Sequence, residues 1–279
     1  MKIAFVTDST CDLPPELAAE RGIEVTPLHV LWGTESYSDG VDIDNETFYK
    51  RLARDSVLPK TSQPAPGEYA EKYRQAIERQ HADVVVCIPI SSRLSGSFAS
   101  AQAASALVDF PVRVVDSRTG SMALGLVLLA AADARDHGAN VDEVVQVAER
   151  ASAHSQMLFS PNTLEFLHRG GRIGNAQRLI GTALSIKPIL YVKDGYIEAL
   201  ENVRTRKRAL ARLVEIVAEY KAKRPLWVGI AHTGASEVDD LRAELQAAAQ
   251  PDRLLQTMTT TSIGVHIGPG AVGIGLVHG

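Results

Sequence analysis

Hydroxyl and carboxylate side chains follow three predicted strands, at the point where each strand ends. The strands and their polar pairs are 2–7 with Asp8-Ser9, 83–90 with Ser91-Ser92, and 112–116 with Asp116-Ser117. In doubly wound sheets, ligands bind beyond the carboxyl ends of the strands. Serine and aspartate are also common caps of the helices that follow, so one pair alone favours a cap. Three pairs together, with Thr61-Ser62 in a fourth polar loop, predict a binding site.

Ser95, Gly96 and Ser97 form a second candidate, directly before an Ala-rich helix predicted over 98–107. Glycine lets a ligand approach the backbone, and the free N–H groups at the start of a helix attract an anion. We therefore expect a phosphate or a carboxylate here, with an ordinary capped helix as the alternative.

Two arginines and one histidine are further candidates. Arg172 stands in a Gly-rich basic turn, and Arg204 opens a basic run before a predicted helix. Both can be solvated charges, or they can face an anion or a protein partner. His266 lies among glycines in a predicted loop, where functional side chains are frequent, so we expect it to belong to a site.

The elements that position these residues are of two kinds. Strands alternate with helices over the first half, which predicts an α/β unit with a mostly parallel sheet. Its helices are expected at 66–80, 98–107, 120–137 and 142–153. Residues 23–31 are expected to form one strand. From about residue 155, hairpin signals such as Asp194-Gly195 favour antiparallel pairing. We expect an N-terminal α/β domain over 1–155 and a C-terminal α+β domain over 156–279, in which 255–277 is strand.

The composition excludes several classes of protein. The chain has 279 residues and a net charge of −4, which argues against a nucleic-acid partner. Its most apolar stretch, 122–132, is shorter than the roughly 20 residues of a membrane span. Cys11 and Cys87 form no metal-binding pair, which predicts no metal and favours the reducing cytoplasm. Aromatic residues are only 5% of the chain, so an apolar pocket would have mainly aliphatic walls.

Eight segments, in order, resemble the DegV family of bacterial fatty-acid-binding proteins over essentially the whole chain. They are VTDST at 6–10, TSQP at 61–64, LSGS at 94–97, VDS at 115–117, GGRI at 170–173, IKPIL at 186–190, Val203-Arg204, and HIGPG at 266–270. Each is weak alone, but their number, order and spacing make the resemblance specific. At Ile267 the chain departs from the usual threonine, which removes a hydroxyl beside His266.

The resemblance implies one long-chain fatty acid, such as palmitate, stearate or oleate, in an apolar tunnel between the two domains. Three groups of residues carry over. The carboxylate would be bound by Thr61, Ser62, Ser95 and Gly96. A supporting network would consist of Asp8, Ser9, Asp116 and His266. The residues facing a partner would be Arg172, Arg204 and His266; that partner is a fatty acid kinase, which converts the carboxylate to an acyl phosphate used in phospholipid synthesis.

The chain is thus expected to be a lipid-binding protein without catalysis of its own or a cofactor, in at most transient contact with a membrane. Two alternatives stay open. In the first, the protein is a lipid-sensing regulator whose Arg172 and Arg204 bind another protein. In the second, it is an enzyme acting on a small phosphate or acyl ester through Asp8, Ser95 or His266, which would require a polar pocket.

Overall fold

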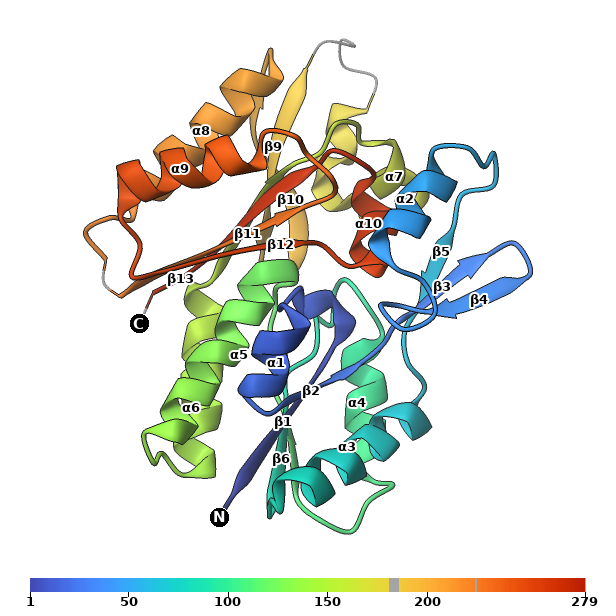
Figure 1. The fold of residues 1–279 in the computed structure, drawn as a ribbon, viewed down its shortest axis with the longest axis vertical. Coiled ribbons are helices and arrows are strands. Elements are labelled where there is room, and N and C mark those ends of the chain that lie inside the picture. The colour runs from blue at the N-terminus through green and yellow to red at the C-terminus, as the bar shows by residue number, and fades with distance from the viewer. Residues whose placement is uncertain (181–185, 224, 279) are drawn as a thin grey trace.

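The computed structural model of the protein describes residues 1–180, 186–223 and 225–278. Its lower half in Figure 1 contains a parallel sheet with the strand order β2-β1-β6-β7. The strands are β1 (Ile3–Asp8), β2 (Ile23–Thr26), β6 (Val84–Cys87) and β7 (Val112–Val114). The helices around this sheet are α1 (Pro15–Glu20), α3 (Pro66–Gln80), α4 (Ser97–Ser105), α5 (Ser121–Asp136) and α6 (Val141–His154).

Strand β1 is buried on both faces, because successive side chains of a strand point to opposite sides. Phe5 packs in one hydrophobic cluster with residues of α5, whereas Val6 packs in another with Tyr69 and Tyr73 of α3. A parallel sheet covered on both faces therefore needs the continuous apolar run that the sequence has here.

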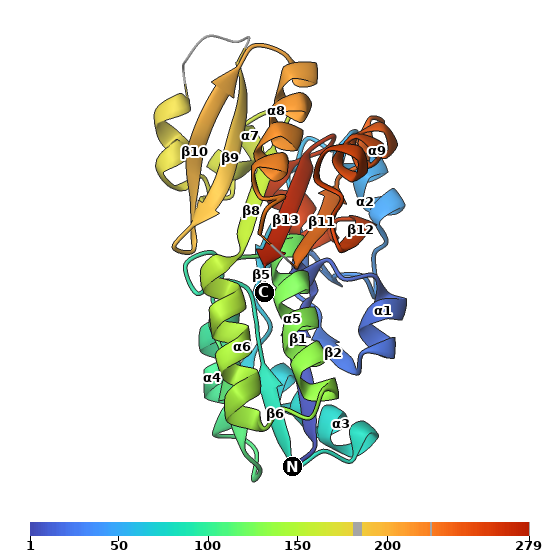
Figure 2. The ribbon, with the colours of Figure 1, turned by 90° about the vertical axis from the view of Figure 1, so that its left-hand side faces the viewer.

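The upper half contains a six-stranded sheet with the order β10-β9-β8-β13-β11-β12. Its strands are β8 (Gln156–Ser160), β9 (Lys187–Lys193), β10 (Tyr196–Val203), β11 (Leu226–His232), β12 (Arg253–Met258) and β13 (Val272–His278). Strands β11 and β12 run parallel, and the other neighbours run antiparallel. Helices α8 (Arg206–Glu219) and α9 (Val238–Ala249) pack on one face (Figure 2), and α5 contacts β11 and β13.

A third, smaller sheet has the order β4-β3-β5 and lies at the right of Figure 1. It consists of β3 (His29–Trp32), β4 (Glu35–Ser38) and β5 (Lys60–Ser62). Helix α10 (Thr261–Ile267) contacts β3 and β5, although it belongs to the last part of the chain. The remaining elements are α2 (Asn45–Leu52), α7 (Glu165–Arg169) and the 3-10 turns η1 (Ser9–Cys11) and η2 (Gly174–Leu179).

The predicted fold class is confirmed, and the helix expected at 66–80 has these bounds as α3. Three local predictions are wrong. The expected strand 23–31 divides at Pro27 into β2 and β3, which belong to different sheets. The expected strand 255–277 contains helix α10 between β12 and β13, and the Thr61-Ser62 loop is strand β5. The domain boundary at residue 155 stays a prediction.

Candidate functional site

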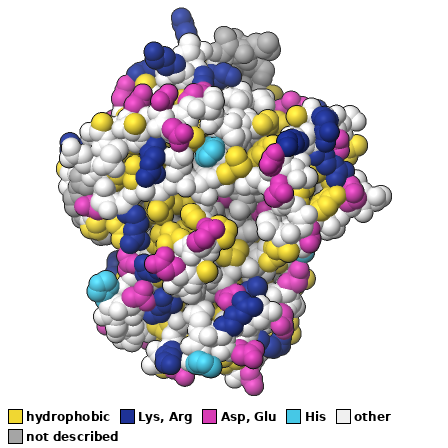
Figure 3. All heavy atoms as spheres, in the orientation of Figure 1, with side chains coloured by type: hydrophobic (Ala, Val, Ile, Leu, Met, Phe, Trp, Pro, Cys, Tyr) yellow, Lys and Arg dark blue, Asp and Glu magenta, His cyan; other side chains and the backbone are white. Residues whose placement is uncertain are grey.

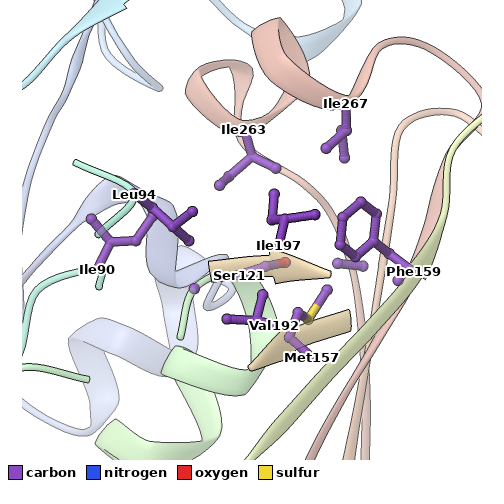
Figure 4. A pocket seen from close by; sticks show the side chains of 12 residues that line it. Ile90, Leu94, Ser121, Met157, Phe159, Val192, Ile197, Ile263 and Ile267 are labelled. Atoms are coloured by element: carbon purple, nitrogen blue, oxygen red, sulfur yellow. The ribbon is translucent and has the colours of Figure 1, made fainter. Parts of the chain in front are cut away.

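A cavity lies between the loop after β6, helix α10 and the hairpin β9–β10. Its larger wall is aliphatic and includes Ile90, Leu94, Ile197, Ile263 and Ile267, whose side chains converge in Figure 4. This part spans about 490 Å³ when the space open to solvent is included. Strands β8, β9, β11 and β13 of the six-stranded sheet contribute further lining residues, which are Met157, Phe159, Val192, Ala231 and Gly273. The expected aliphatic pocket is therefore present.

A second hollow adjoins the aliphatic one. The two share five lining residues, which are Ile90, Leu94, Ile197, Ile263 and Ile267. Here the wall is polar in part, because Thr61, Ser95, Arg172 and His266 line it together with Thr10 and Ser262. Four side chains predicted for the site, far apart in the sequence, thus meet at one end of an aliphatic cavity. The arrangement suits an amphipathic molecule with a polar head and an apolar tail.

Thr61 and His266 form the polar contact at this end, with 2.7 Å between Thr61 Oγ1 and His266 Nε2. Strand geometry explains why Thr61 lines the cavity and Ser62 does not, since adjacent side chains point to opposite faces. Ser62 Oγ instead donates to the carbonyl of Gln63 at 3.3 Å. The structure therefore places Thr61, but not Ser62, among the cavity residues.

His266 lies on helix α10 rather than in the predicted loop. Burial, with the positive charge of Arg172 nearby, lowers the pKa of His266 to about 4. The imidazole is thus neutral at pH 7 and acts as a hydrogen-bonding group, not as a cation. Gly170 makes room for the ring, because a Cβ there would lie 2.2 Å from His266 Nδ1.

The predicted anion loop at Ser95 and Gly96 is held close to the segment after β5. Ser95 Oγ accepts a hydrogen bond from the N–H of Ser97 at 3.2 Å, at the start of α4. Gly96 has an ordinary helical φ of −72°, so turn geometry does not require glycine here. A Cβ would meet the end of the flexible Gln63 side chain at 2.9 Å, so the two segments lie close together and Gln63 would have to shift to admit one.

The two arginines have different environments. Arg172 Nε donates to the carbonyl of Leu94 at 3.1 Å, and its Nη1 donates to that of Gly170 at 2.7 Å. These bonds hold the guanidinium in the cavity wall, so Arg172 belongs to the site instead of being a freely solvated charge. Arg204 is exposed just after β10 and makes no ion pair within the described part of the chain. Its contact with a partner stays a prediction.

Asp8, at the end of β1, is a fully buried carboxylate that supports the cavity wall. It accepts hydrogen bonds from Thr10, from the Ile90 N–H at 3.1 Å and from the Tyr69 hydroxyl at 3.3 Å. Burial raises the pKa of Asp8, and these hydrogen bonds lower it in part. Because Thr10 and Ile90 line the cavity, Asp8 fixes its floor without touching the space inside.

Asp116 supports a neighbouring loop. Its carboxylate accepts from the Ser92 hydroxyl at 2.6 Å, from the Ser92 N–H at 3.1 Å and from the Arg118 N–H at 3.0 Å. These bonds join the loop after β6 to the loop after β7. Asp116 does not line the cavity, so its place in the supporting network is structural.

Sequence reasoning missed two buried carboxylates, Asp12 and Asp39, that hold the start of α10. Asp39 accepts from Ser9 Oγ at 2.7 Å, from Thr261 N and Oγ1 at 2.9 and 2.6 Å, and from Ser262 Oγ. Ser9, expected in the network that supports the carboxylate-binding residues, donates to this anchor instead. The run of four hydroxyl residues at 259–262 was the signal for it.

Asp12 is the second anchor and has a left-handed backbone, with φ 52°. It accepts from Ser121 Oγ at 2.5 Å, from the Thr260 N–H at 2.7 Å and from Thr259 Oγ1. Burial raises the pKa of Asp12 to about 6, although these hydrogen bonds lower it. Near neutral pH the Asp12 carboxylate is therefore ionised, and its ionisation lowers the free energy of unfolding.

This ionisation predicts a pH dependence of folding. The raised pKa means that the folded protein holds the Asp12 proton more tightly than the unfolded chain. Its contribution to the free energy of unfolding is full below about pH 4 and falls by roughly 3 kcal/mol as the pH rises through 6. Urea unfolding from pH 4.5 to 7.5 measures this. The free energy of unfolding of Asp12→Asn should rise relative to that of the parent chain as the pH rises, whereas that of the exposed Asp240→Asn should keep a constant difference from the parent. If the free energies of unfolding of Asp12→Asn and the parent chain changed with pH in parallel, the pKa of Asp12 would not be raised.

Two further features bear on the kind of site. Among the described residues, no three His, Cys, Asp or Glu side chains cluster so that they could hold a metal ion. Within the same part of the chain, no helix is both long and apolar enough to cross a membrane. On the face drawn in Figure 3, Lys and Arg side chains are interspersed with Asp and Glu, and hydrophobic side chains gather midway along the molecule.

Comparisons with known proteins agree with this geometry. A family model described as "Uncharacterised protein, DegV family" matches residues 2–279. The DegV domain-containing protein of Deinococcus radiodurans is 41% identical over 281 residues, which cover 99% of this chain and 98% of the relative. The structure of a fatty acid-binding DegV family protein from Thermus thermophilus matches with a TM-score of 0.93 and 34% identity, over 100% of both chains. That of a stearic acid-binding protein from Eubacterium ventriosum matches with a TM-score of 0.90 and 26% identity, over 99% of this chain and 98% of the other. The chain therefore belongs to the DegV family.

Proposed function

We propose that the protein binds one long-chain fatty acid, with the acyl chain in the aliphatic hollow and the carboxylate at Thr61 and Ser95. The observation that carries this proposal is the cavity itself, whose aliphatic walls continue into an end lined by hydroxyl groups. The ligands of the Thermus and Eubacterium proteins support the class of molecule. An enzyme acting on a small phosphate would need a more polar pocket than this one.

The apolar tail supplies most of the binding free energy. Burying about 15 methylene and methyl groups contributes on the order of 12 kcal/mol before the losses of chain and overall motion are subtracted. The head group then needs only to have its hydrogen bonds satisfied. The neutral hydroxyl groups of Thr61 and Ser95 can do this, while Arg172 directs its Nε and Nη1 donors to the Leu94 and Gly170 carbonyls.

Thr61 can serve the carboxylate and His266 at the same time. A neutral His266 that carries its proton on Nε2 donates to Thr61 Oγ1, and the Thr61 hydroxyl then donates to the ligand. The carboxylate would thus be held by a polarised hydroxyl instead of a fixed charge, which leaves its oxygens open to further chemistry.

The test of binding is mass spectrometry of the purified protein, under native conditions and after extraction with organic solvent. One fatty acid per chain, released on denaturation, supports the proposal and identifies the preferred chain length. A protein that is empty and takes up neither palmitate nor oleate would overturn it.

The head-group assignment predicts different effects for two adjacent residues. Thr61→Val keeps the shape of the side chain and removes its hydroxyl, so we expect fatty-acid binding to weaken about 10- to 100-fold, the range for a hydrogen bond to a charged group. Ser62→Ala is the matched control and should bind as the parent chain does, because Ser62 points away from the cavity. Displacement of a fluorescent fatty acid measures both. Equal losses would place the carboxylate elsewhere.

We further propose that the bound carboxylate is presented to a separate fatty acid kinase in the cytoplasm and phosphorylated to an acyl phosphate, with Arg204 at the contact. The exposed position of Arg204 just after β10 supports this step. Loaded protein, kinase and ATP should yield an acyl hydroxamate when hydroxylamine is added. Binding without this product would favour the lipid-sensing alternative.

A further inference from the structure

A groove apart from the aliphatic cavity lies where the end of α6 meets the end of β13. Figure 2 shows both elements, with the C-terminus marked. It spans about 840 Å³, the space open to solvent included. Its walls combine an aromatic ring, small aliphatic side chains and basic groups. They are Ala130, Val147, Arg150, Ala151, His154, Pro225, Trp227, Val277 and His278. No carboxylate is among these lining residues, so the groove favours an anion over a cation.

The two basic side chains of α6 are available to a ligand. Arg150 and His154 are four residues apart, so they lie on the same face of the helix, one turn from each other. Within the described residues, Arg150 forms no ion pair. His154 Nδ1 is bonded to the Arg150 carbonyl at 2.8 Å, which leaves its Nε2 for another partner.

The opposite wall contributes a third nitrogen ligand. The His278 ring stacks on Tyr220, with 5.0 Å between the centroids, and Lys223 Nζ lies 4.9 Å from the same tyrosine ring. His278 Nδ1 is buried without a hydrogen-bond partner in the described part of the protein. A buried polar atom without a partner is costly, and a ligand in the groove would relieve that cost.

Trp227 gives the groove its aromatic wall. The Arg253 guanidinium lies 4.2 Å from the indole centroid and holds the ring in place. An indole wall beside cationic groups favours an anion with an apolar, preferably aromatic, body.

This groove is separate from the fatty-acid cavity, although both use the same face of the sheet. Along β11 and β13, the cavity is lined by Ala231 and Gly273, and the groove by Trp227 and Val277. The glycines between them, Gly229 and Gly275, are covered by α5: a Cβ on Gly229 would lie 2.6 Å from Met122, and one on Gly275 2.4 Å from the backbone of Ala123. Helix α5 thus seals one space from the other.

We propose that this groove is a second binding site, which takes a small organic anion with an aromatic body. Its anionic group would be held by Arg150, His154 and His278, and its ring would pack on Trp227 and the aliphatic side chains of α5 and α6. Because the groove and the cavity share one sheet face and helix α5, both ligands would be bound to the same rigid element.

The test uses 8-anilinonaphthalene-1-sulfonate as the probe, with the protein first saturated with stearate to fill the main cavity. We expect one probe molecule per chain and quenching of Trp227 emission in a Trp32→Phe background, where Trp227 is the remaining tryptophan. Arg150→Glu should weaken probe binding at least tenfold. The exposed Lys207→Glu on α8 makes the same charge change away from the groove and should alter binding less than twofold.

The comparison of Arg150→Glu with Lys207→Glu is made with and without stearate, so its outcome does not depend on the proposed fatty-acid binding. His154→Glu repeats the test if Arg150→Glu fails to fold. Equal affinities for the Arg150 and Lys207 variants, unchanged Trp227 emission, or no saturable binding would each overturn the proposal.

Discussion

Replacing Ile267 with glutamate is expected to reduce fatty-acid binding at least 100-fold, while the protein stays folded. Ile267 lines both the aliphatic hollow and the polar hollow, so its side chain lies along the path of the acyl chain. A carboxylate here would be desolvated by the ligand and would repel its head group, and each effect costs several kcal/mol in a dry cavity. Native mass spectrometry and displacement of a fluorescent fatty acid measure the loss.

Two further variants show whether the loss is specific to the cavity. Leu200→Glu introduces the same charge on β10, where the side chain is 40% exposed and lines neither hollow, so it should bind fatty acid normally. Ile267→Thr keeps the site uncharged and should retain binding within about tenfold, since it removes roughly two buried carbon atoms. If Ile267→Glu bound as tightly as Leu200→Glu, the acyl chain would lie outside this cavity.

The sequence pattern was informative where local physics decides the structure. Helix α3 was predicted at its observed bounds from its amphipathic pattern. In the structure Pro66 occupies the first turn, and the buried residues Tyr69, Tyr73 and Ala76 recur at helical spacing. Three strands of the parallel sheet, β1, β6 and β7, were found from their apolar runs, whereas β2 was predicted as part of a longer strand. In both cases the signal lies within a few neighbouring residues.

Residues in close contact across the fold gave no such signal. His266 was expected in a loop because of the nearby glycines, yet Gly264 is helical, and a Cβ there would lie 2.4 Å from the Tyr49 hydroxyl oxygen. That glycine permits close packing instead of a turn. Asp39 likewise bonds to residues 222 and 223 positions away, a distance over which no local pattern reports. The residue types at Thr61, Ser95 and His266 thus indicated a site, but that these side chains meet at one end of a cavity came only from the family resemblance.

Asp39→Ala is expected to lower the free energy of unfolding by about 3–5 kcal/mol, a large share of the 5–15 kcal/mol that typically stabilises a domain. The Asp39 carboxylate is buried and accepts hydrogen bonds from Ser9, Thr261 and Ser262. Alanine would leave these donors buried without an acceptor, at a cost of about 1–3 kcal/mol for each unsatisfied group. Urea unfolding followed by circular dichroism measures the change.

The same substitution should also weaken fatty-acid binding, because α10 carries Ile263, His266 and Ile267 into the cavity. Asp42→Ala is the matched control in the same loop: its carboxylate is exposed and accepts from the Ser38 N–H at 2.8 Å, so a loss below about 1 kcal/mol is expected. Asp39→Asn keeps one acceptor oxygen and should fall between the two. If Asp39→Ala and Asp42→Ala unfolded at the same urea concentration, Asp39 would not anchor α10, and the position of His266 would have to be fixed by its contacts with Thr61 and Gly170 alone.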